Sequence, residues 1–118
     1  MDRRTAKDLI EEVQTFLKVL PKATITKGVV KGPPKGYGLK FTFKTRPTIE
    51  STRFLDSVAE SEGAGLIPEG KTIKLIFADF DLGNRWHKAF GELKKKKASF
   101  KSTEQLIEFL RKHRLLTK

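Results

Sequence analysis

Cysteine is absent from this chain of 118 residues, and tryptophan, tyrosine, methionine and asparagine each occur only once. Without thiols the protein can form neither a disulfide bond nor a thiolate metal site. Side chains that degrade at high temperature are scarce whereas lysine is abundant, a composition typical of proteins from thermophiles. We therefore expect a thermophilic source.

Long hydrophobic runs are also missing. No apolar run approaches the roughly 20 residues that a bilayer-spanning helix needs, and the first five residues, Met-Asp-Arg-Arg-Thr, lack the apolar region of a signal peptide. We expect a cytoplasmic protein without a membrane partner. The length predicts one domain over residues 1–118, and 37% apolar with 33% charged residues is typical of a globular chain.

Acidic residues are missing from residues 13–49, although the whole chain has 14 of them against 25 Lys and Arg, a net charge of +11. That stretch contains only basic charges: Lys18, Lys22, Lys27, Lys31, Lys35, Lys40, Lys44 and Arg46. A second basic block consists of Arg85, Lys88, Lys94–Lys97 and Lys101. The charged residues within 50–69 are mainly acidic. Such segregation predicts a basic side that attracts a polyanion.

Apolar residues at helical spacing predict three helices, over residues 5–20, 51–62 and 102–114. The last of these begins with Ser102-Thr-Glu-Gln105, which matches a capping box. Residues 81–97 fit either a helix or a strand.

Strands are predicted over residues 23–30, 37–44 and 72–80, the last being the most apolar and therefore central. Glycine and proline predict loops over residues 31–36 and 63–70. The first two strands would form a hairpin. The sequence therefore predicts an α+β fold: a small, mainly antiparallel sheet of three to four strands, with helices at both ends of the chain and one in the middle.

The strand over residues 37–44 has the clearest alternation. Lys40, Thr42 and Lys44 alternate with apolar residues, so they share one face at a spacing of roughly 7 Å. Tyr37, Phe80, Trp86, Phe90 and Phe100 are candidates for stacking on bases, or for the core. The predicted nucleic-acid site contains Lys27, Lys31, Lys35, Tyr37, Lys40, Phe41, Lys44, Arg46, Arg85, Trp86 and Lys88.

An enzymatic alternative comes from Asp79, Asp81, Glu92 and Lys94. An acid after an apolar strand, followed by Glu-x-Lys, superficially matches the Mg²⁺-dependent restriction-endonuclease pattern. The match departs where Glu-x-Lys continues into further lysines, and Asp81 is equally explained as a helix N-cap. His87 and His113 are isolated in sequence, so we expect no metal site, no cofactor and no catalysis.

The Tyr37-Gly-Leu-Lys-Phe-Thr-Phe43 strand and the aromatic stretch over residues 77–90, in a small basic chain, resemble the archaeal single-stranded DNA-binding ThermoDBP family. The resemblance implies an antiparallel sheet that forms a cleft, with apolar residues for bases and Lys or Arg at its rim. The sequence thus predicts a protein that binds single-stranded DNA or RNA through a basic, aromatic-lined sheet face, with little sequence specificity. A nuclease, a basic protein-interaction subunit of a nucleoprotein complex, and a homodimer stay open.

Overall fold

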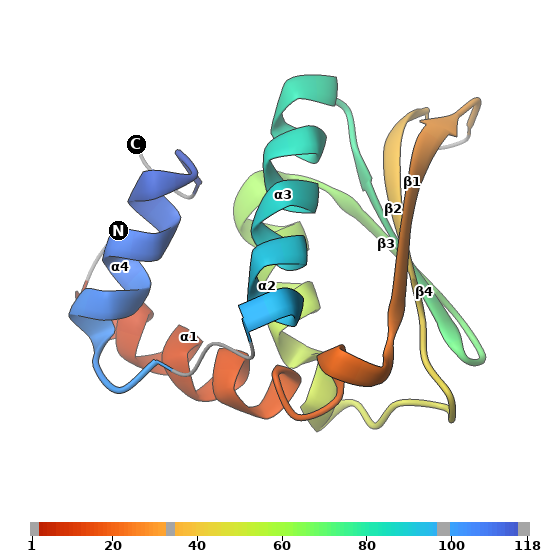
Figure 1. The fold of residues 1–118 in the computed structure, drawn as a ribbon. Helices are drawn as coiled ribbons and strands as arrows, with labels where there is room; N and C mark the ends of the chain where they lie inside the picture. Colours follow the sequence, from red (N-terminus) through yellow and green to blue (C-terminus); the bar gives the residue numbers. More distant parts are fainter. Residues whose placement is uncertain (1–2, 33–34, 97–99, 116–118) are drawn as a thin grey trace.

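The computed structural model describes residues 3–32, 35–96 and 100–115, which form one antiparallel sheet of four strands covered on one side by helices (Figure 1). The strands are β1 (Thr24–Val30), β2 (Gly36–Thr42), β3 (Gly65–Glu69) and β4 (Thr72–Phe77). The helices are α1 (Arg3–Phe16), α2 (Arg53–Glu62), α3 (Phe80–Lys96) and α4 (Thr103–Lys112). Short 3-10 turns occupy Leu20–Lys22 and Glu50–Thr52. The predicted α+β class is confirmed.

The sheet order is β1-β2-β4-β3, with every neighbouring pair antiparallel. β3 forms one edge of the sheet, where a loop was predicted. The sequence signal failed because Gly65 and Pro68 are turn formers, yet an edge strand tolerates a proline that cannot complete the hydrogen-bond ladder. β4 is central, as predicted.

The core lies between the sheet and the helices and is dominated by aromatic rings. Phe41 of β2 packs edge-on against Phe90 of α3, with ring centroids 4.9 Å apart, and against Phe16 of α1 at 6.1 Å. Trp86 packs against Phe54 and donates a 2.7 Å hydrogen bond from Nε1 to Glu62 of α2. This satisfied polar contact allows the indole to be fully buried.

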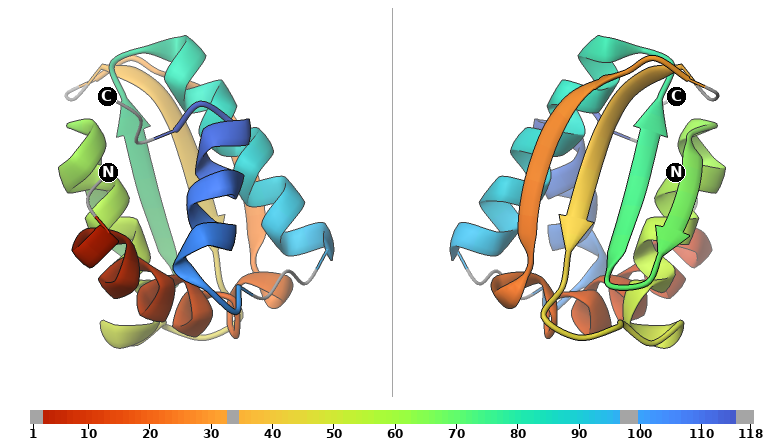
Figure 2. Two further views of the ribbon diagram at one scale, coloured as in Figure 1. Left: turned by 90° about the vertical axis from the view of Figure 1, so that its left-hand side faces the viewer. Right: turned by 90° about the vertical axis from the view of Figure 1, so that its right-hand side faces the viewer.

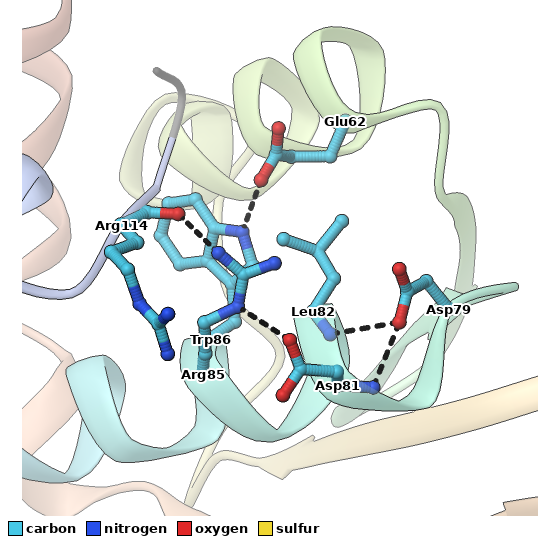
Figure 3. A network of polar contacts seen from close by, with 7 residues as sticks. All are labelled: Glu62, Asp79, Asp81, Leu82, Arg85, Trp86 and Arg114. Carbon is cyan, nitrogen blue, oxygen red and sulfur yellow. Dashed lines mark hydrogen bonds and ion pairs between the residues drawn. The ribbon is translucent and has the colours of Figure 1, made fainter. Parts of the chain in front are cut away.

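Residues 81–97 fitted either a helix or a strand, and their described part is helical, since α3 continues to Lys96. Asp79 begins it, since its Oδ1 accepts hydrogen bonds from the backbone N–H groups of Asp81 and Leu82 at 2.9 and 3.2 Å (Figure 3). The N-cap is therefore Asp79, and the N-cap role proposed for Asp81, two residues later, was wrong. Asp81 instead pairs with Arg85 one turn along the helix.

At α4 the N-cap half of the predicted capping box is confirmed, because Ser102 Oγ accepts from the backbone N–H of Gln105 at 3.3 Å. The Gln105 side chain accepts in turn from the backbone N–H of Lys101. The first helix is shorter than predicted, ending at Phe16. None of the helices over the described residues is long and apolar enough to cross a membrane.

Candidate nucleic-acid interface

All four helices lie on one side of the sheet and leave the other face open (Figures 1 and 2). Leu39 and Phe41 of β2 point toward the helices and are fully buried. Since side chains alternate along a strand, Gly38, Lys40 and Thr42 point to the open face.

The strand register extends this assignment to the other three strands. Gly28, Thr26 and Thr24 of β1 pair with Gly38, Lys40 and Thr42, and β4 contributes the partners Ile76, Lys74 and Thr72. β3 adds Gly65, Ile67 and Glu69. Among the described strand residues, none on the open face is aromatic.

Two lysines lie at the centre of this face. Lys40 of β2 is the direct register partner of Lys74 of β4. Like charges directly opposite each other on neighbouring strands are destabilising. Glu69 offsets only one of them weakly, with its Oε1 3.8 Å from Lys74 Nζ in an exposed pair. The centre of the open face therefore keeps a concentrated positive charge.

A groove runs beside the two lysines. It has a volume of about 220 Å³ and is lined by Thr26, Lys27, Gly28, Val29, Val30, Gly38, Leu39, Lys40 and Lys74. The paired Gly28 and Gly38 contribute no side chains of their own to its floor. A Cβ at Gly38 would lie 2.7 Å from Val30 Cγ2, whereas one at Gly28 would meet nothing within 4 Å. A ligand can therefore approach the backbone of β1 closely.

Most of the predicted basic residues are exposed, but only some gather in one place. Lys27 and Lys40 line the groove. Lys31 and Lys35 flank the β1–β2 turn, whose residues 33 and 34 lie outside the described residues, as does Lys97 of the second basic block. The other predicted exposed cations are Lys44 and Arg46, which follow β2, and Lys88 on α3.

Arg85 is committed to contacts within the protein. Its Nε lies 3.2 Å from Asp81, and its Nη1 donates to the backbone carbonyl of Arg114 (Figure 3). A guanidinium held in this way is less available to a phosphate than an exposed lysine is.

Phe41 and Trp86 were wrongly predicted to contact a ligand, because both side chains are fully buried in the core. Phe90 and Phe100 are buried as well. Tyr37 and Phe80 remain partly accessible to solvent. Tyr37, however, lies on the helix side of the sheet, whereas Lys40 lies on the open face. On β2, all of which the structure describes, the predicted combination of lysines and aromatic rings on one face is absent, since the period of two places Lys40 on one side and Tyr37 and Phe41 on the other.

The four residues of the nuclease alternative do not come together. Asp81 and Glu92 lie eleven residues apart on α3, about 16 Å along a helix. Glu92 pairs with His113 at 2.8 Å and with Lys112 at 3.1 Å, while Lys94 donates to the backbone carbonyl of Ala23. Over the described residues there is no group of three His, Cys, Asp or Glu that could hold a metal ion.

Sequence reasoning missed Lys74 and the glycine pair. The alternation of Thr72, Lys74 and Ile76 within the most apolar strand was a usable signal for Lys74. Comparisons with family models, with curated proteins and with solved structures gave no match for this chain.

Proposed function

We propose that the protein binds nucleic acid through the open face of its sheet. The observation that carries the proposal is the Lys40–Lys74 pair beside the groove over Gly28 and Gly38. Two lysines at adjacent strand positions, of which only Lys74 has a weak acidic partner, favour an anion between them, since a phosphate relieves their mutual repulsion. Thr26 and Thr42 stand beside Lys40 with hydroxyl groups of the kind that donate to phosphate oxygens.

The form of the site supports weak sequence specificity. Lysine is a point charge on a flexible stem, so it contacts phosphates without the bidentate geometry that arginine uses on bases. The open face offers few groups that could distinguish base edges. We propose an extended single strand of DNA or RNA as the ligand, the class of ligand that the ThermoDBP resemblance implies, and binding dominated by counterion release.

The test measures anisotropy of labelled single-stranded DNA, single-stranded RNA and duplex DNA over a range of salt concentrations. The variant Lys40→Ala/Lys74→Ala should lose about 25-fold in single-strand affinity near 0.1 M salt, and its salt slope should fall by about 1.4, the value for two lost phosphate contacts.

A charge-matched control is Lys18→Ala/Lys101→Ala, which removes two exposed lysines away from the strands of the sheet. It should change the affinity much less. Equal losses in both variants would mean that only net charge matters, and would overturn the assignment to the open face. No binding by the wild type to any of the three ligands would overturn the proposed function and favour an acidic protein partner.

A further inference from the structure

The groove ends at β1, and on the far side of that strand lies an exposed apolar patch formed by Val29, Tyr37 and Phe80. The rings of Tyr37 and Phe80 have centroids 5.7 Å apart at an interplanar angle of 40°. Phe80 is 50% exposed and Val29 is 66% exposed. Val29 is the register partner of Tyr37, so their side chains share the helix side of the sheet.

The fold makes specific room for this patch. Gly83 lies one turn into α3, and a Cβ there would come within 2.9 Å of Tyr37 Cδ2. Glycine is unfavourable inside a helix, and here it lets the tyrosine side chain approach the helix backbone closely. Figure 1 shows that α3 begins at the end of the sheet where β1 and β2 are joined. The patch therefore lies at a rim of the molecule.

β1 and α3 also carry polar groups that suit a nucleotide. Lys27 reaches across from β1 and donates to Asn84 Oδ1 at 3.4 Å in an exposed contact. His87 lies on the next turn of α3, and partial burial, followed by the charge of Lys27, lowers its pKa. A neutral imidazole and the free amide N–H groups of Asn84 can donate to and accept from a base edge.

Lys27 and Val29 connect the apolar patch with the groove of the open face, since both also line the groove. β1 is an edge strand, so a ligand chain can pass over it from one side of the sheet to the other. A strand with its phosphates at Lys40 and Lys74 would reach Phe80 by turning over this edge.

We propose that Phe80, Tyr37 and Val29 form a stacking site for an unpaired base of the strand held in the groove, an inference that rests on the proposed function. Exposed rings stack on any base and require that it be free of a partner. Lys27 would hold the phosphate at the crossing point. The stacking site, rather than the open face, would then confer preference for single strands.

The test compares single-strand and duplex affinities of Phe80→Ala with those of Ile49→Ala, which truncates another apolar side chain, 75% exposed. Loss of one stacked base should weaken single-strand binding by about 5- to 150-fold in Phe80→Ala, leave duplex binding unchanged, and leave both affinities unchanged in Ile49→Ala. Phe80→Tyr, which keeps a ring, should retain most of the affinity.

A second measurement is photo-crosslinking of an oligonucleotide that carries 5-iodouracil, with the product mapped by mass spectrometry. Crosslinks at Tyr37 or Phe80 are expected. Crosslinks confined to other residues, or equal losses for single strands and duplex in Phe80→Ala, would overturn the stacking site while leaving the open-face function in place. No binding by the wild type would overturn both.

Discussion

The two faces of the sheet differ in kind although the same strand, β2, builds both. Its helix side contributes Leu39 and Phe41 to a core of interlocking aromatic rings, and its open side presents Lys40 and Thr42. Stability therefore depends on one set of alternate residues and the proposed binding on the other. The two properties can therefore be altered separately at neighbouring positions of one strand.

The largest expected effect is a difference in the free energy of unfolding between variants of Phe41 and of its neighbour Lys40. Phe41→Ala should lower the free energy of unfolding by about 3–5 kcal/mol, because a fully buried ring is replaced by a cavity. Lys40→Ala should change it by no more than about 0.5 kcal/mol, as expected for an exposed site. Urea unfolding followed by circular dichroism measures both, and similar losses in the two variants would contradict the division of the faces.

The next effect concerns the groove. Gly28→Val should leave the fold intact, because nothing lies within 4 Å of the added Cβ and valine favours strands. Its side chain would fill the groove, so single-strand affinity should fall by about tenfold, the value of one or two phosphate contacts. The control is Gly63→Ala, at the left-handed C-cap of α2, which should cost stability and leave the affinity of the folded protein unchanged. Unaltered single-strand binding by Gly28→Val would show that the groove is not part of the binding site.

A smaller effect is expected at Glu69, which pairs with Lys74 beside Lys40. Glu69→Gln removes the partner of Lys74 and should tighten single-strand binding by about twofold, in keeping with the small energy of an exposed ion pair. The gain should vanish when Lys74→Ala is combined with it. An equal gain in that double variant would show that Glu69 acts through net charge alone.

The smallest effect concerns His87 on the helix side. Its pKa is lowered first by burial and then by Lys27, so the folded state takes up the proton at lower pH than the unfolded chain does. The free energy of unfolding should therefore decrease as the pH falls below the ordinary histidine value of about 6.5. His87→Asn should show a shallower decrease in urea unfolding at pH 7.5 and 5.5, and an identical pH dependence would contradict this.

Local sequence patterns predicted most of the elements because periodicity and capping are local properties. The alternation over residues 37–44 and the cap at Ser102 are examples. β3 was missed because Gly65 and Pro68 imitate a turn, and its pairing with β4 is a tertiary contact.

The candidate site was predicted less well. Lys27 and Lys40 were found from charge segregation, whereas Lys74 was missed. Phe41 and Trp86 were placed in the site because the sequence does not say which aromatic rings the helices cover. The Lys40–Lys74 pair depends on β2 and β4 being neighbours, although a whole helix and a strand separate them in the chain.

The burial of the only tryptophan also determines how the protein can be followed spectroscopically. The indole of Trp86 packs against Phe54 and Phe90 and donates a hydrogen bond to Glu62. Its fluorescence should therefore be blue-shifted in the folded protein, shift to the red on denaturation, and stay constant while a ligand fills the open face. Intrinsic emission thus reports the integrity of the core in the same cuvette in which a labelled oligonucleotide reports occupancy of the surface.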